Sequence, residues 1–142
     1  MPRIRYNPES IVIPADPAAI LDWAACHITA VGLHQGSELF AGIGRTVTLP
    51  CWPRGAIDVA AGNGRGSSSR TYDWAAIDRG RDQAYHAFAE YLAARPLAAG
   101  TTDSARWLHR SVMDEWSAVP GRTAEQAAQA LRAAAETFHR LF

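Results

Sequence analysis

Residues 50–62 read PCWPRGAIDVAAG, and this stretch contains signals for both the start and the end of a helix. Pro53 suits the first turn of a helix, because its missing N–H is one that a helix leaves unbonded at that end. Gly62 suits the position just after a helix, where the chain often takes a left-handed conformation that glycine adopts without steric cost. The stretch therefore predicts a short apolar helix that begins next to Cys51 and Trp52.

Helical periodicity recurs on both sides of this stretch. Apolar residues from Ile20 to Val31 follow an Asp16-Pro17 start signal and precede Gly32. The last helix is predicted to start with a capping box at residues 123–126, TAEQ, and to bury Leu131, Ala134 and Phe138. Two more helices are expected between these, over about 74–92, where Gly80 is a possible break, and over about 105–116.

The remaining segments are shorter or less regular. Residues 1–15 are expected to form an extended arm. Apolar and β-branched pairs on either side of Gly42-Ile43-Gly44 predict a small β-hairpin within residues 33–49. Residues 62–70, rich in Gly and Ser, predict a mobile loop. We therefore expect a mainly α fold, a single domain of about five helices over residues 16–142, with a small β-hairpin or strand pair in its N-terminal third.

Composition narrows the class of protein. The chain has 142 residues, of which 48% are hydrophobic and 20% are charged, so one domain can form a core without metal or disulfide. Its 14 basic and 14 acidic residues balance, and no stretch is dense in arginine and free of acids. We therefore do not expect nucleic acid binding, which needs a basic face against the phosphates.

The sequence also predicts where the protein is located and whether its cysteines are paired. The chain contains no apolar run of the roughly 18 residues that a membrane helix needs, and no export signal. We predict no membrane association and a cytoplasmic location. Cys26 and Cys51 are then expected to remain free thiols.

Several short motifs together resemble a known kind of domain. They are His34-Gln35-Gly36, Cys51 followed by residues 55–57 and 60–62, and the turn at residues 120–125, PGRTAE. Over about residues 16–140 this order is similar to a family of small uncharacterised domains from actinobacteria and their phages and plasmids. Such domains usually carry an aromatic residue, Asn and Asp before the turn, where this chain has WSA at 116–118. The resemblance implies a small helical domain and no known activity.

Cys51 is the residue for which an enzymatic role can be formulated. A thiol at the start of a helix is stabilised as a thiolate by the helix dipole, and Arg54 lies three residues on. A cysteine-dependent acyl-transfer or hydrolytic enzyme would take His34 as its base and Gln35 as a donor to the oxyanion. The competing interpretation, which we prefer, is that Cys51 is a small buried residue beside Trp52.

The spacing of the residues gives less support to metal binding, phosphate binding or DNA binding. Cys26, His27, His34 and Cys51 match no zinc motif, because adjacent helical residues point about 100° apart, so no metal or other cofactor is expected. The glycine-rich residues 62–66 follow a predicted helix, where a phosphate-binding loop would follow a strand. A helix-turn-helix reader of DNA is opposed by the carboxylates of Asp114, Glu115 and Glu125 around the last turn.

A surface interaction is the function that we prefer from the sequence. Helical spacing puts Trp107 on one face with Arg110 and Asp114, away from the apolar stripe. A tryptophan beside arginine is a composition enriched in interaction hot spots, and Trp52 with Arg54 offers a second such pair. Alternatively, Ile4 or Tyr6 of the arm covers Trp107. The sequence thus favours a non-catalytic accessory or regulatory module that binds a protein partner or forms a homo-oligomer.

Overall fold

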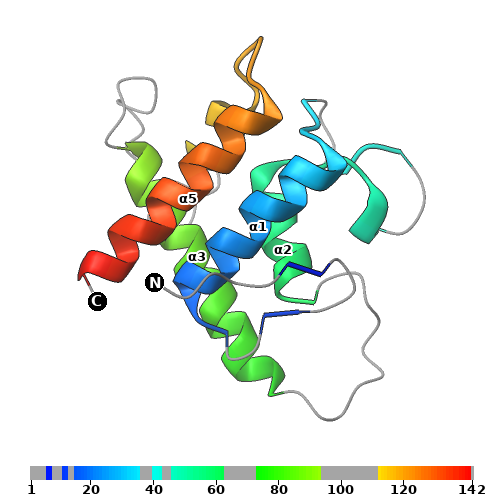
Figure 1. The fold of residues 1–142 in the computed structure, drawn as a ribbon. Helices are drawn as coiled ribbons and strands as arrows, with labels where there is room; N and C mark the ends of the chain where they lie inside the picture. Colours follow the sequence, from blue (N-terminus) through cyan, green and yellow to red (C-terminus); the bar gives the residue numbers. More distant parts are fainter. Residues whose placement is uncertain are drawn as a thin grey trace.

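The computed structural model of the chain is mainly helical (Figure 1). Its helices are α1 (Pro17–Val31), α2 (Pro53–Ala60), α3 (Trp74–Ala93), a helical segment over residues 112–117, and α5 (Ala124–Leu141), with a 3₁₀ helix, η1, at Thr46–Thr48. The structure describes residues 6–7, 11–12, 15–35, 40–42, 46–62, 73–93 and 112–141. Within these residues the predicted mainly α architecture is confirmed.

The helix ends are capped by the side chains that the sequence indicated. The Asp16 carboxylate accepts from the Ala19 N–H at 3.0 Å, and Gly32 follows α1 with a φ of 99°. At α5 the Thr123 hydroxyl accepts from the Gln126 N–H at 3.1 Å. The Gln126 side-chain oxygen in turn accepts from the Thr123 N–H at 3.0 Å. The predicted capping box is therefore confirmed, and it satisfies the N–H groups of Thr123 and Gln126 locally.

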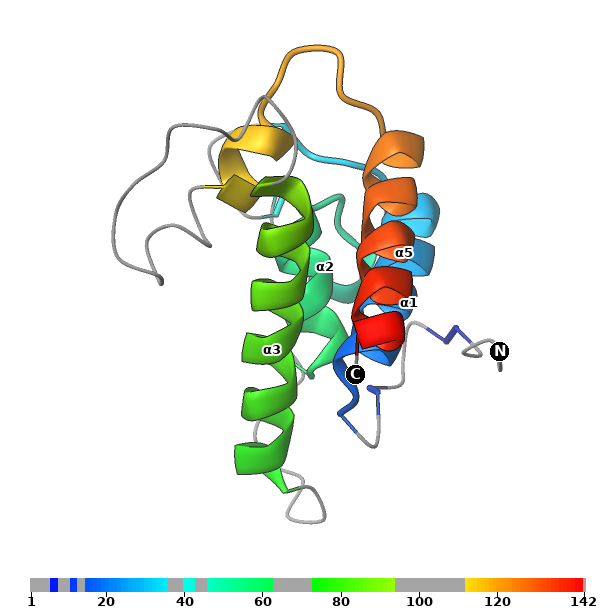
Figure 2. The same cartoon turned by 90° about the vertical axis from the view of Figure 1, so that its left-hand side faces the viewer.

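The helices pack against one another around a common core. α1 and α5 run side by side in opposite directions, and α2 packs against both α1 and α3 (Figures 1 and 2). Alanines on α5 permit close approach to α1, because a methyl group lets the two backbones come near. The core contains large side chains from every helix: Ile20, Leu21, Trp23, Ile28, Ile57, Phe88, Leu92, Met113 and Leu131.

One residue of the predicted α5 core is less buried than expected. Leu131 and Ala134 are buried as predicted, whereas Phe138 is only half-buried against the core. Phe138 lies in the last turn of α5, at the end of the helix pair, so fewer neighbours surround it. The predicted burial of Phe138 is therefore only partial.

The N-terminal residues that the structure describes pack onto the helices. Val12 is buried, and its N–H donates to the Ala60 carbonyl at the end of α2 at 3.0 Å. Ala15 passes so close to α3 that a Cβ on Gly80 would collide with the Ala15 carbonyl and lie 2.7 Å from its side chain. Gly80 therefore does not break α3, which is continuous; the glycine makes room for the incoming chain.

The predicted β-hairpin of residues 33–49 is not found in the described residues. Thr46–Thr48 forms a 3₁₀ helix, and Leu33 and Phe40 each make a single isolated bridge with Cys51. Pro50 before Cys51 and Pro53 two positions after it have no N–H to donate, which limits the backbone pairing of this stretch. Residues 36–39 and 43–45 of the predicted hairpin, and residues 63–70 of the predicted mobile loop, lie outside the described part of the chain.

Candidate functional site

Cys51 is a structural junction in the core. Its side chain is 0% exposed. Its N–H donates to the Gly32 carbonyl at 3.2 Å, and its carbonyl accepts from the His34 N–H at 3.1 Å. Cys51 thus ties the chain leaving α1 to the chain entering α2.

Burial also sets the protonation state of this thiol. Desolvation, with a further contribution from the charge of Asp58, raises the pKa of Cys51 from 9.0 to about 12. The helix dipole at the start of α2 favours a thiolate, but removing the charge from water outweighs it at a fully buried site. At neutral pH Cys51 is therefore a neutral thiol and a poor nucleophile.

Gln35, the predicted oxyanion donor, is engaged elsewhere. Its side-chain nitrogen donates to the Ser117 carbonyl at 3.1 Å and to the Val119 carbonyl at 2.7 Å. These carbonyls lie at the end of the helical segment 112–117, where the last carbonyls of a helix have no partner within it. Gln35 acts as a remote cap for this segment.

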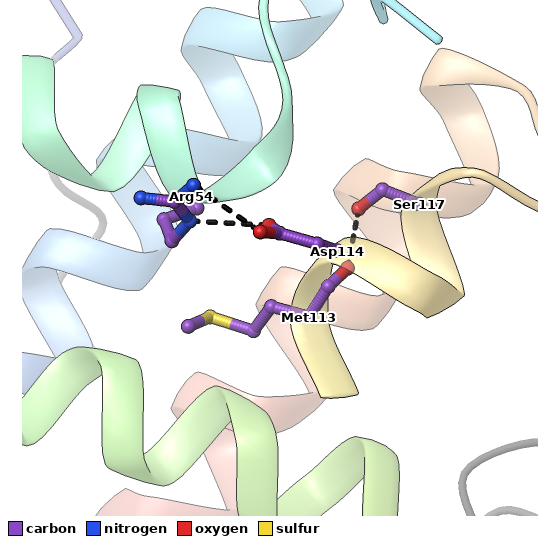
Figure 3. Close-up of polar contacts among 4 residues, drawn as sticks. All are labelled: Arg54, Met113, Asp114 and Ser117. Atoms are coloured by element: carbon purple, nitrogen blue, oxygen red, sulfur yellow. Dashed lines mark hydrogen bonds and ion pairs between the residues drawn. The ribbon is translucent and has the colours of Figure 1, made fainter. Parts of the chain in front are cut away.

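Arg54 and Asp114 form a paired contact between α2 and the segment 112–117 (Figure 3). The Arg54 Nε donates to Asp114 Oδ1 at 3.1 Å, and its terminal nitrogen donates to Oδ2 at 3.2 Å. The two side chains are 19% and 26% exposed. This forked geometry fixes the direction of approach as well as the distance. We call the Gln35, Arg54 and Asp114 contacts the polar seam.

Contacts within residues 113–122 also stabilise the helical segment 112–117. Figure 3 shows the Ser117 hydroxyl donating to the Met113 carbonyl, at 2.7 Å, and both residues are buried. The Arg122 guanidinium lies 3.9 Å from the centroid of the Trp116 ring, and its Nε donates to the Trp116 carbonyl at 3.0 Å. Burial lowers the pKa of Arg122. Sequence reasoning missed this contact, although a turn at residues 120–122 brings the chain back over the segment's end.

The predicted binding residues are described only in part. Trp52 immediately precedes α2, two positions before Arg54, and is half-buried. Trp107 and Arg110 lie outside the described residues. The structure therefore brings together Arg54 and Asp114 of the predicted set, from two segments that are 60 positions apart.

The histidine and cysteine of α1 have different surroundings. His27 is 0% exposed, and its Nδ1 lies 2.7 Å from the hydroxyl of Tyr6. Its ring stacks on Trp23, with centroids 4.9 Å apart. Cys26 beside it is partly exposed. Nowhere in the described segments do three His, Cys, Asp or Glu residues come close enough to hold a metal ion.

Comparisons with known proteins give one match. The model of a family of unknown function (DUF6197) matches residues 12–137. No curated protein and no solved structure matches the chain. Among the helices described here, none combines the length and the apolar character needed to cross a bilayer.

Proposed function

The chain belongs to DUF6197, a family of unknown function, and we propose that it is a non-catalytic accessory or regulatory module that binds a protein partner or a second copy of itself. The observation that carries this proposal is the burial of Cys51. A cysteine nucleophile must be ionised and open to its substrate, and Cys51 has 0% exposure and a raised pKa.

The surface that we propose for binding is centred on the start of α2. Trp52, two positions before Arg54, is partly exposed, and Arg54 and Asp114 form a partly exposed charged pair. Aromatic residues and arginine are enriched among the residues that dominate binding energies. The sequence prediction adds Trp107 and Arg110 to the proposed binding residues, although both lie outside the described part of the chain.

Sedimentation velocity tests this face for self-association. If Trp52 anchors a homo-oligomer, Trp52→Ala should shift the protein toward monomer at a given concentration, because truncating a hot spot costs about 2 kcal/mol or more of binding energy. Tyr85→Ala is the matched control, since Tyr85 is a half-buried aromatic with Arg81 5.8 Å from its ring centroid, on α3. Equal shifts in the two variants, or none in Trp52→Ala, would count against Trp52 as an anchor of self-association.

Alkylation with iodoacetamide across a pH series tests the cysteine-enzyme alternative. Because the pKa of Cys51 is raised to about 12, Cys51 is protonated in the folded protein at neutral and mildly alkaline pH and should stay unmodified. Cys26, which is partly exposed, is the internal control, and peptide masses separate the two sites. Rapid modification of Cys51 well below about pH 8 would instead favour a catalytic thiolate.

A further inference from the structure

Tyr6 and His27 share a short hydrogen bond between the N-terminal part of the chain and α1. The Tyr6 hydroxyl oxygen is 2.7 Å from His27 Nδ1. A bond that an N–H group donates to oxygen is typically about 2.9–3.0 Å long, and bonds donated by hydroxyl groups are shorter. A phenol is also a stronger donor than a neutral imidazole, and an imidazole nitrogen is a stronger acceptor than a phenol oxygen. The Tyr6 hydroxyl is therefore assigned as the donor and His27 Nδ1 as the acceptor.

Trp23 supports this imidazole from one face. His27 is 0% exposed, and its ring stacks on that of Trp23 with centroids 4.9 Å apart and planes inclined by 18°. The face of an indole attracts a cation that lies within about 6 Å of its centroid. Burying a charge is costly unless something compensates it, and Trp23 offsets part of that cost when His27 takes up a proton. The cluster thus holds a proton donor, a base, and a ring that stabilises the protonated base.

We propose that Tyr6 and His27 are a proton-coupled redox pair that gives one electron to a one-electron oxidant, such as a small radical. Tyr6 loses the electron, its O–H bond breaks, and the proton forms an N–H bond at His27 Nδ1. The products are a neutral phenoxyl radical, an imidazolium and the oxidant reduced by one electron. Tyr6 is half-buried, so an oxidant approaches its ring from solvent. This activity needs no protein partner and is separate from the binding role proposed above.

Tyr85 on α3 provides the contrast within the same chain. It is half-buried like Tyr6, and the Arg81 guanidinium lies 5.8 Å from the centroid of its ring. Among the described residues, no imidazole accepts a hydrogen bond from the Tyr85 hydroxyl. A nearby cation opposes the removal of an electron from the ring, and without a base the proton must pass to water. Tyr85 should therefore be oxidised more slowly than Tyr6.

Oxidation of the full chain by photogenerated tris(bipyridine)ruthenium(III) tests where the radical forms. Electron paramagnetic resonance of freeze-quenched wild type should show a tyrosyl radical, and a nitroso spin trap followed by peptide mass mapping should place it on Tyr6. Tyr6→Phe keeps the ring, loses the hydroxyl and should remove this signal. Tyr85→Phe is the matched control and should leave the signal unchanged. A tyrosyl signal that persists in Tyr6→Phe, or trapping mainly at another tyrosine in the wild type, overturns the proposal.

His27→Gln separates proton transfer from hydrogen bonding alone. The glutamine carbonyl accepts a hydrogen bond but does not take up a proton at neutral pH. Because a positioned base typically accelerates proton transfer by about 10²–10⁴-fold, the rate of Tyr6 oxidation should fall by about a hundredfold, and an unchanged rate overturns the role of His27. Wild type in heavy water gives a second measurement that needs no substitution at a buried position. Slower oxidation of Tyr6 there supports coupled transfer of the proton, and an equal rate overturns it.

Discussion

Where α1 meets α5 the buried side chains are apolar and many of them are small, whereas the polar seam, which joins Gln35 and Arg54 to residues 112–119, is made by charged and amide groups. Ala127, Leu131 and Ala134 are buried on α5. At the polar seam, Arg54 and Asp114 remain 19% and 26% exposed. Burial of apolar area supplies most of the free energy of folding, while partly exposed ion pairs contribute little. The first region should therefore stabilise the fold, and the second should mainly fix how residues 112–119 are oriented.

Truncation in the α1–α5 interface should have the largest effect. Leu131→Ala removes a side chain with 0% exposure and should lower the free energy of unfolding by about 2–5 kcal/mol, through lost transfer energy and the cavity left behind. Denaturation in urea measures it. Phe138→Ala on the same helix is the control and should cost less, because Phe138 is half-buried. If Leu131→Ala lowers the free energy of unfolding by less than about 1 kcal/mol, the α1–α5 interface is not the main source of stability.

The polar seam should give a smaller and salt-dependent effect. In a double-mutant cycle of Arg54→Ala and Asp114→Ala, we expect a coupling energy of about 0.5–1 kcal/mol, because water screens a pair that is partly exposed. The coupling should weaken in concentrated salt. Arg54→Lys should recover only part of it, since an ammonium group cannot form the forked contact. A coupling as large as the loss at Leu131 would show that the seam, too, holds the fold together.

The two cysteines show the same contrast between a buried and a partly exposed environment. Cys26 and Cys51 have the same chemistry, yet Cys26 is partly exposed and Cys51 is sealed in the core. The sequence placed Cys51 beside a helix start, where a dipole lowers a thiol pKa, but it does not reveal how much water remains there. Desolvation depends on neighbours distant in the chain, so the catalytic and the buried interpretations could be compared only in the folded structure.

The sequence by itself determined the features that depend on near neighbours along the chain. Asp16 before Pro17, the Thr123–Gln126 capping box and Gly62 after α2 mark helix ends by local hydrogen bonds and backbone freedom. Periodicity identified the buried faces of α1, α3 and α5 for the same reason. It overestimated the burial of Phe138, because periodicity gives the face of a helix and not how far its neighbours extend.

Only the tertiary structure decided the contacts between distant segments. Gln35 caps a segment 82 and 84 positions away, and Tyr6 reaches His27 across 21 positions. Leu33 and Phe40 each bridge to Cys51, outside the expected hairpin, and Gly80 proved to make room for Ala15 where a helix break was considered. Each of these outcomes depends on which backbone groups and side chains meet once the helices have packed. That information is spread over the whole chain, and no local pattern carries it.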